Sequence, residues 1–439
     1  MNETTASTAA PAGSGQLVRS LGLWGLAAVI LNGMLGAGIF ALPGSVAHFS
    51  GSWVPLIVFG VGMALLPIVL VFARLSGLFE ATGGPLLYVS AGLGPVAGYQ
   101  VGWLQCLSGA SSVAANVNLL ADYALRAAPP WLAGQTAHLG VVLAALGVIL
   151  WINLLDTQRS AAWIKRISVA KLLPLALLIG LALPGIGSAS AFRPATEWSL
   201  SQAVMLSIYA FIGFEGALCI AGEAIDPRRD FPRALVGVFL AVVALYALLV
   251  WGYVVTAYVP GVEDRASLLT MAVALMGPVG MTVILVTAVV SIIGITIVST
   301  LFVSRRILAL QQTGSLPGWF GMIRPETGLP RNAVYVAVGV ITLLAMSGGF
   351  TALAALSVAA RMLIYLGCVA SLPVVLVRRG LPVSGFVIVT TASAAIACLV
   401  LIVQVSLSAW TGLALAMAIG LVVRWSASRS IRAAAAASG

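Results

Sequence analysis

Long apolar runs alternate with short polar segments along almost the whole chain. Twelve of these runs approach or exceed the roughly 20 residues that a helix needs to cross a bilayer. The segments between them are too short for a separate soluble domain, and the one before residue 94 is expected to be a polar loop. The pattern therefore predicts an all-α membrane protein with about 12 transmembrane helices, at 20–46, 53–73, 94–125, 139–155, 166–186, 199–222, 234–258, 267–303, 332–348, 352–377, 384–404 and 406–425.

The first run contains too many helix breakers for one continuous helix. Gly33, Gly36 and Gly38 fall close together, and Pro43 and Gly44 follow. In lipid, an interrupted backbone is tolerated only where protein or a water-filled cavity satisfies its polar groups. We therefore expect two half-helices, with the free N–H groups of the second binding a carboxylate. Replacing Gly38 by leucine should then block the carboxylate and leave the fold intact.

The sixth run repeats this feature, because Gly213, Glu215 and Gly216 lie in its middle. The two interrupted runs are five helices apart, and since five is odd, the second enters the membrane in the opposite sense. Paired interruptions of this kind are typical of transporters built from inverted repeats. The sequence thus predicts a disordered cytoplasmic N-terminus at 1–19, repeats at 20–186 and 199–377, two further helices at 384–425 and a cytoplasmic tail at 426–439.

Composition supports a protein that crosses the bilayer many times. Of the 439 residues, 61% are hydrophobic and 8% are charged, whereas about a quarter are charged in a soluble domain. The net charge of +10 comes from basic residues in alternate loops, which form no patch for nucleic acid. Seventeen of them fall on one side and only Arg126, Arg193 and Arg265 on the other. We therefore expect a multi-pass protein of the cell membrane, a bacterial inner membrane, with both termini in the cytoplasm.

Three short motifs lie around the predicted interruptions and the eighth helix. The first is Gly36–Phe40 (Gly-Ala-Gly-Ile-Phe), the second is Gly213–Glu215 (Gly-Phe-Glu) with its continuation at 223–234, and the third is 304–309 with 314–317. Together they resemble the motifs of the amino acid–polyamine–organocation (APC) transporters, although Ala37 stands where that family commonly has serine. The resemblance extends from about residue 20 to residue 425. It implies a LeuT-like fold of five plus five inverted helices followed by two C-terminal helices.

The resemblance also implies where an amino acid would bind. The N–H groups of Ala37 and Gly38 would bind its carboxylate, and the carbonyls of Met34, Tyr209 and Ile212 would bind its α-amino group. The ends of half-helices do present unpaired carbonyl oxygens to a cation. The alternative is that the glycines at these places only allow close helix packing.

Two charged residues inside the apolar runs are candidates for proton coupling. Glu215 is an acid in mid-membrane, a costly position that is usually functional, and the resemblance links this acid to proton-dependent transport. The alternative is a structural, hydrogen-bonded acid. Lys171 resembles the family lysine whose ammonium replaces the ion of sodium-coupled relatives, unless it extends to the cytoplasmic interface. Arg361, deep in the tenth helix, would either pair with an acid or line the outer vestibule.

The residues around the two interruptions indicate the class of substrate. Their side chains are mostly apolar, with Glu215 the one charge among them, which favours neutral aliphatic or sulfur-containing amino acids. The expected substrate-binding residues are Met34, Ala37, Gly38, Tyr209, Phe211, Ile212 and Glu215.

The eighth helix bears on the coupling ion. It offers Ser299, Thr300 and Ser304 as possible sodium ligands. A positive Lys171 about 4 Å from such an ion would repel it by roughly 4 kcal/mol, however. We therefore expect sodium-independent transport whose rate changes with pH.

These expectations combine into a secondary active, proton-coupled amino acid transporter that works by alternating access. An exporter or exchanger of the same fold would use the same parts. A membrane-embedded enzyme is the rival from another class, but the acids and bases inside the apolar runs are few and scattered. We therefore expect no enzyme activity, and no metal or cofactor. The expected partners are the amino acid, protons and the lipid bilayer, with the chain a monomer or a homodimer.

Overall fold

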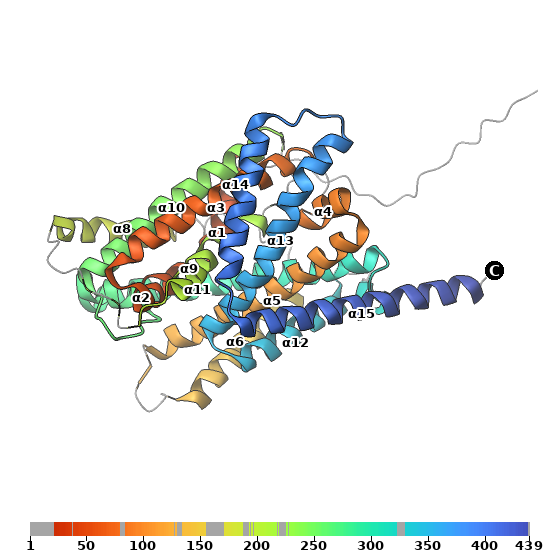
Figure 1. The fold of residues 1–439 in the computed structure, drawn as a ribbon. Helices are drawn as coiled ribbons and strands as arrows, with labels where there is room; N and C mark the ends of the chain where they lie inside the picture. Colours follow the sequence, from red (N-terminus) through yellow and green to blue (C-terminus); the bar gives the residue numbers. More distant parts are fainter. Residues whose placement is uncertain are drawn as a thin grey trace, which may run out of the picture.

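The computed structural model describes residues 22–36, 38–79, 84–126, 128–129, 134–154, 171–187, 193, 195, 197–216, 218, 225–226, 228–322 and 330–437. Their regular structure is helical, and no strand occurs within these ranges (Figure 1). The α-helices are α1 (Leu23–Met34), α2 (Gly38–Ser50), α3 (Val54–Ser76), α4 (Pro85–Leu93), α5 (Pro95–Arg126), α6 (Gln135–Leu154), α8 (Leu172–Ala182), α9 (Leu200–Phe211), α10 (Asp230–Thr256), α11 (Ser267–Gln312), α12 (Arg331–Ser347), α13 (Phe350–Arg378), α14 (Gly385–Val403) and α15 (Leu407–Ala437).

The lengths and apolar character of these helices confirm a multi-pass membrane protein. In the described part of the chain, seven helical stretches are long and apolar enough to cross a membrane. Shorter apolar helices, α1, α8, α9 and α12 among them, accompany these stretches. The predicted all-helical membrane fold is therefore confirmed, while the predicted start of the fifth helix at 166–170 lies outside the described residues.

Three predicted boundaries are wrong. The expected polar loop before residue 94 contains α4, whose apolar residues Tyr88 and Val89 are buried as α4 packs between α5 and α13. The eighth helix does not end at residue 303: α11 continues to Gln312, so the 304–309 motif lies inside it. The last helix, predicted to end at residue 425, continues as α15 to Ala437. An alanine-rich stretch such as 433–437 favours helix.

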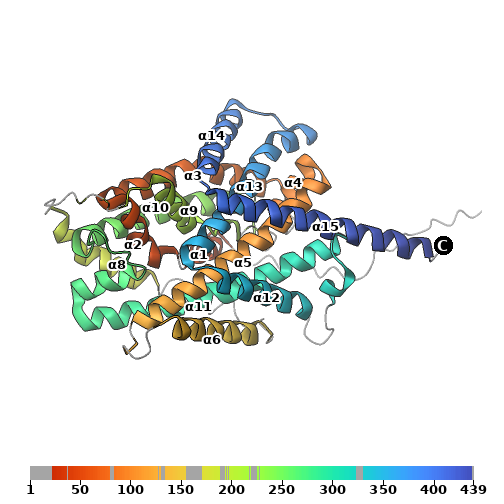
Figure 2. The same ribbon diagram turned by 60° about the horizontal axis from the view of Figure 1, so that its bottom comes forward.

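Helix α5 forms the centre of the bundle. It packs against α4, α6, α11, α12, α13 and α15, and Figure 2 shows it in the middle of the molecule. On α5, Tyr99 donates a hydrogen bond to the carbonyl of Gly420 at 2.8 Å and Trp103 donates one to that of Ala416 at 2.8 Å. These bonds hold α15 against α5, although the far end of α15 projects beyond the other helices in both views (Figures 1 and 2).

Candidate functional site

The first apolar run is interrupted as its glycines predict. Helix α1 ends at Met34, Leu35 and Gly36 are not helical, and α2 begins at Gly38. The N–H of Gly36 donates to the carbonyl of Met34 at 2.8 Å, which turns the chain tightly at this point. Ala37, one of the expected carboxylate ligands, lies outside the described residues.

The second interruption follows α9. This helix ends at Phe211, Ile212 has an extended backbone, and Gly213 has a φ of 121°, which favours glycine. The N–H of Gly216 then donates to the carbonyl of Gly213 at 3.1 Å. Much of the predicted second half-helix, up to residue 222, lies outside the described residues.

The two interruptions contact each other through backbone atoms. A Cβ added at Gly213 would lie 2.1 Å from the carbonyl oxygen of Gly33, and one added at Gly33 would lie 2.8 Å from that of Gly213. A Cβ at Gly38 would lie 2.9 Å from the Cα of Ala210 on α9. Close helix packing is therefore real at Gly33 and Gly38. The expectation that Gly38→Leu would leave the fold intact is wrong, because leucine would push α2 away from α9.

Lys171 lies at the first interruption and not at the membrane interface. Its side chain is buried, and its ammonium group donates to Asn32 Oδ1 at 2.6 Å and to the carbonyl of Leu35 at 3.1 Å. On α11, Ser291 Oγ also donates to the Leu35 carbonyl, at 3.4 Å. The ammonium thus lies at the gap in the first apolar run, on the side where α11 approaches.

The hydroxyl of α11 that donates to the first interruption is that of Ser291. The sequence had suggested Ser299, Thr300 and Ser304 instead. Thr300 donates to the carbonyl of Thr296 at 2.8 Å and Ser304 to that of Leu301 at 2.8 Å, both within α11. Ser291 is a turn or more closer to the N-terminus of α11. A single sequence does not show which face of a helix points toward the interruption, so Ser291 was missed.

Glu215 is a fully hydrogen-bonded member of a buried ion pair. Its Oε1 lies 2.5 Å from Nε of Arg361, and its Oε2 accepts from the hydroxyl of Tyr365 at 3.1 Å and from the N–H of Gly213 at 3.0 Å. Arg361 also donates to the hydroxyl of Ser357. Glu215 and Arg361 are 5% and 8% exposed, so an isolated charge at either place would be strongly penalised. The first of the two roles expected for Arg361, pairing with an acid, is the observed one.

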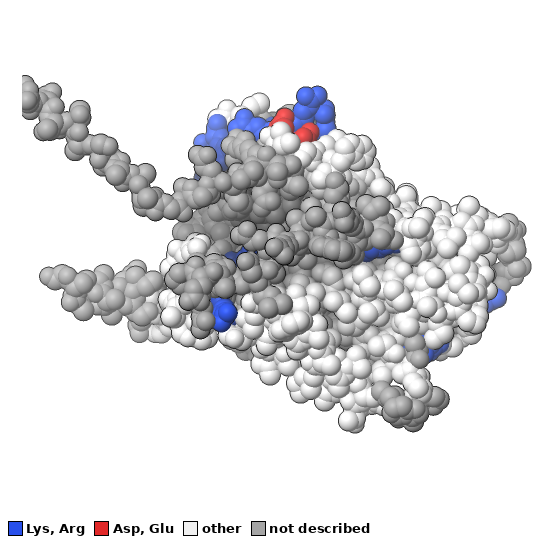
Figure 3. Space-filling model, turned by 180° about the vertical axis from the view of Figure 1, so that it is seen from behind, with Lys and Arg blue, Asp and Glu red and all other residues white. Residues whose placement is uncertain are grey.

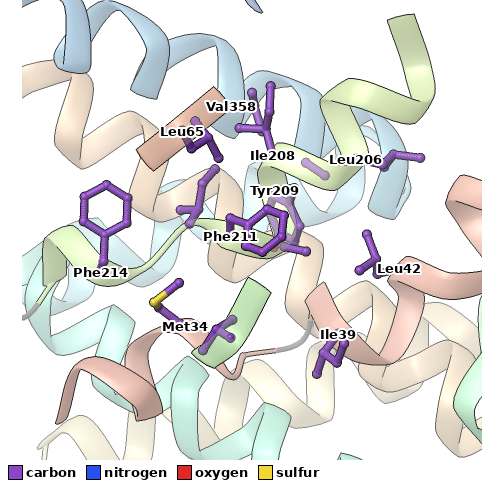
Figure 4. Close-up of a cluster of buried hydrophobic side chains, with 14 of the residues drawn as sticks. Met34, Ile39, Leu42, Leu65, Leu206, Ile208, Tyr209, Phe211, Phe214 and Val358 are labelled. Carbon is purple, nitrogen blue, oxygen red and sulfur yellow. The ribbon is translucent and has the colours of Figure 1, made fainter. Parts of the chain in front are cut away.

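The expected binding residues on α9 are divided between two surroundings. The Tyr209 hydroxyl donates to Asn116 Oδ1 of α5 at 2.7 Å. Phe211 instead packs against Phe239 and Tyr246 of α10, with ring centroids 5.8 and 5.4 Å apart. Figure 4 shows Tyr209 and Phe211 within an apolar cluster around the ends of α1 and α9.

Ile212, another expected residue, and its neighbour Phe214 lie in the same cluster. Phe214 packs against Phe72 of α3 at 5.6 Å between ring centroids, and Ile212 is 7% exposed. The carbonyl of Met34, expected to bind an amino group, already accepts a hydrogen bond from the hydroxyl of Tyr246 at 2.8 Å. Met34 therefore makes a structural contact in this conformation.

A small polar cavity borders the ion pair. Its volume is about 10 Å³, and Gln105, Ser108, Arg306 and Ile364 line it together with Glu215, Arg361 and Tyr365. This volume is close to the minimum that one water molecule needs. This cavity is therefore too small to hold an amino acid in the structure.

Comparison with known proteins now adds independent information. The sequence model of the amino acid permease family matches residues 21–423. The chain is 29% identical to an uncharacterized transporter of Mycobacterium tuberculosis over 341 residues, 75% of this chain and 74% of that protein.

Two relatives from Bacillus subtilis carry substrate names. The glutamate/serine transporter AimA is 27% identical over 353 residues, 73% of this chain and 64% of that protein. The branched-chain amino acid permease BcaP is 24% identical over 351 residues, 74% of each chain. The family match covers both interruptions and the residues that pair across them, and it confirms the resemblance to the APC transporters. This chain therefore belongs to the amino acid permease family and is a membrane transport protein for amino acids.

Proposed function

We propose that the protein is a secondary active, proton-coupled transporter of neutral aliphatic or sulfur-containing amino acids. It works by alternating access in the cell membrane, with both termini in the cytoplasm. The observation that carries this proposal is the position of Lys171. Its ammonium group lies 2.6 Å from Asn32 Oδ1 and 3.1 Å from the Leu35 carbonyl, at the gap in the first helix. A cation held there by the protein does the work of a bound sodium ion and excludes it by charge repulsion.

An inverted repeat is supported by the pattern of helix contacts. We pair the α1/α2 unit with α9, α3 with α10, α5 with α11, α6 with α12 and α8 with α13. Exchanging the members of each pair converts several observed contacts into other observed contacts. Thus α5 packs on α6 as α11 packs on α12, α5 on α12 as α11 on α6, and α13 on α5 as α8 on α11. Such an exchange is expected if two equivalent units associate about a pseudo-two-fold axis.

The substrate site that we propose lies between the two interruptions. Its carboxylate would bind the N-terminus of α2 at Ala37 and Gly38, where free N–H groups and the helix dipole favour an anion. The carbonyls of Tyr209 and Ile212 would bind the amino group, since that of Met34 is taken by Tyr246. Because the two interruptions touch in this conformation, substrate entry requires them to separate, as alternating access demands.

The preference for a neutral substrate follows from the ion pair. Glu215 is neutralised by Arg361 at 2.5 Å, so it does not offer a free negative charge to a cationic substrate. The expected side chains Phe211 and Ile212, and their neighbour Phe214, are apolar and buried. The printed substrates of BcaP, branched-chain amino acids, agree with this preference.

Of the two candidate proton carriers, the geometry favours Lys171 over Glu215. The Glu215 carboxylate is in direct contact with the guanidinium of Arg361. Protonation of the carboxylate would leave the arginine charge buried without a partner. The hydrogen bonds of Lys171 are made to neutral oxygen atoms of Asn32 and Leu35. A neutral amine can still donate to both, so loss of a proton does not break the local structure.

The proposal is tested with the purified chain in proteoliposomes. Accumulation of a labelled branched-chain amino acid is measured with and without an imposed pH gradient, in sodium-free and sodium buffers at the same pH. We expect accumulation that follows the pH gradient and is indifferent to sodium. Strict sodium dependence would contradict the assignment of Lys171, and conversion of the amino acid without a second compartment would indicate an enzyme.

A further inference from the structure

A second concave site lies away from the interruptions, where α3 and α13 end and α10 and α14 begin. This cleft has a volume of about 800 Å³. Its described lining comes from these four helices and the segments beside them, and includes no residue of α1, α2 or α9. It is therefore separate from the proposed transport site.

The charge of the cleft is positive. Arg74, Arg228 and Arg379 line it, and its described lining contains no acidic residue. The guanidinium of Arg379 lies 4.4 Å from the centre of the Phe79 ring and donates to the carbonyl of Leu78, which holds it at the rim. Arg74 is exposed and makes no hydrogen bond or ion pair to any residue that the structure describes.

The position of the cleft agrees with the distribution of charge on the molecule. In Figure 3, Lys and Arg side chains, with a smaller number of Asp or Glu atoms between them, gather at the top of the molecule, the end at which α13 finishes and α14 begins in Figure 1. In the proposed orientation this end faces the cytoplasm. The cytoplasmic leaflet carries the anionic phospholipids of a cell membrane.

The rest of the lining is apolar and continues along the membrane-facing side of α14. Leu381 and Phe386 form one wall of the cleft and are 37% and 70% exposed. From there, exposed apolar residues recur at helical spacing down one face of α14, namely Phe386, Val389, Ile396, Val400 and Val403. A positive cleft thus opens onto an apolar track that runs the length of a membrane helix.

We propose that this cleft binds an anionic phospholipid. Its phosphate would contact the guanidinium groups of Arg74, Arg228 and Arg379, which match phosphate oxygens in geometry and charge. Its acyl chains would lie along the apolar face of α14. Basic pockets between helices on the cytoplasmic side commonly bind acidic headgroups. The inference rests on the proposed membrane orientation and not on the proposed substrate or coupling ion.

Native mass spectrometry of the full chain tests this assignment. The protein is titrated with phosphatidylglycerol and, separately, with phosphatidylcholine of the same acyl chains. The variants are Arg74→Gln, which removes a charge from the cleft, Arg74→Lys, which keeps it, and Arg305→Gln. The last is the matched control, because Arg305 is an exposed arginine on α11 and α11 does not line the cleft.

We expect phosphatidylglycerol to bind more tightly than phosphatidylcholine. Arg74→Gln should weaken phosphatidylglycerol binding about fivefold, the factor that corresponds to about 1 kcal/mol per arginine. Arg74→Lys should lose less, and Arg305→Gln should bind as the wild type does. Unchanged melting temperatures of the variants show that each one is folded.

Other outcomes overturn the proposal. Equal affinity for both lipids, or an equal effect of Arg305→Gln, would mean that no headgroup site exists here. If inorganic phosphate alone raises the melting temperature of the wild type but not that of Arg74→Gln, the cleft is a site for a free anion. A dimer that Arg74→Gln dissociates would indicate contact with a second copy of the chain. The experiment measures lipid binding and not transport, so a negative result would not contradict the proposed function.

Discussion

Lys171 and Glu215 are both buried ionisable residues, but their hydrogen-bond partners differ in charge. Glu215 has a guanidinium at 2.5 Å, whereas Lys171 donates to the neutral oxygens of Asn32 and Leu35. Two opposite charges in contact stabilise each other where water is absent, so neither readily changes its protonation state. The acceptors of Lys171 carry no charge, so in the proposed mechanism Lys171 is the group that releases and rebinds a proton.

Lys171→Ala should abolish proton-driven accumulation of substrate. The variant no longer carries a proton through the transport cycle, so the internal concentration should not exceed the external one. Exchange of labelled for unlabelled substrate across the membrane should persist. Uptake and counterflow in proteoliposomes measure the two activities separately, and concentrative uptake by the variant would contradict the coupling role.

Asn32→Asp tests the role of Lys171 with a nearly isosteric change in the residue that accepts its hydrogen bond. A carboxylate at the position of the Asn32 side chain, where Oδ1 lies 2.6 Å from the ammonium, would hold Lys171 charged. We therefore expect concentrative uptake to fall at least tenfold while substrate binding is retained, since no group of the carboxylate or amino subsites is removed. Accumulation equal to that of the wild type would show that the lysine need not lose its proton.

The ion pair between Glu215 and Arg361 predicts non-additive losses of stability. Glu215→Gln or Arg361→Met alone leaves one buried charge without its partner, which typically costs about 3–5 kcal/mol. The double variant removes both charges and should melt at a higher temperature than the poorer single variant. If the two losses simply add, the carboxylate and the guanidinium are not paired in the folded protein.

Among the elements, the unit formed by α2 and α9 depends on backbone contact. Gly33 of α1 meets Gly213 with no side chain between them, and Gly38, at the start of α2, lies against the Cα of Ala210 on α9. This contact satisfies the requirement that broken backbone inside a membrane be covered by protein. It also leaves no room for a substrate between the two interruptions, so the proposed site can open only if one interruption moves away from the other.

Gly213→Ala should therefore be strongly destabilising. Its Cβ would lie 2.1 Å from the Gly33 carbonyl oxygen, and the φ of 121° disfavours any residue with a side chain. We expect a loss of roughly 1–3 kcal/mol or more, seen as a lower melting temperature and reduced transport.

The matched control for this substitution is Gly60→Ala in α3. No atom lies within 4 Å of a Cβ at Gly60, and alanine in an exposed helix is typically about 1 kcal/mol more favourable than glycine. Gly60→Ala should therefore be neutral or stabilising. Equal losses in both variants would mean that the two interruptions do not touch.

For the whole molecule, the closed cavity beside the ion pair sets the terms of substrate binding. About 10 Å³ beside Glu215 and Arg361 is far too little for an amino acid. At the proposed site the two interruptions are also in contact, so the proposed transport cycle requires a second conformation in which they separate. A ligand can shift the population toward it only by binding the open conformation more tightly than the closed one.

A thermal-shift screen of amino acids should reveal the substrate class. Ligands stabilise by mass action, by about 2.7 kcal/mol at 100 times the dissociation constant. We expect branched-chain amino acids or methionine to raise the melting temperature, and arginine and polyamines to have no effect. If the cationic compounds alone raise it, Glu215 faces the substrate and the neutral-pocket proposal fails.

Features that depend on local composition could be read from the sequence. In a bilayer, a run of about 20 apolar residues can form all of its backbone hydrogen bonds within itself only as a helix. Glycines inside such a run mark an interruption, as they do at Gly36 and Gly213. The family was indicated in a different way, by the resemblance of three short motifs to those of known transporters. The error at α4 arose because this helix of 9 residues is too short to be recognised as a membrane span. The error at α15 arose because its alanine-rich end continues the helix beyond the apolar run.

Only the tertiary structure decided which residues meet. Lys171 is separated from Asn32 by 139 positions, and Glu215 from Arg361 by 146. Hydropathy says that a charge in an apolar run needs a partner, but the choice of partner depends on the rotation of each helix about its axis. That rotation is set by contacts between helices far apart in the chain. For this reason the sequence left Arg361 with two roles and Ser291 with none, and the packed bundle assigned both.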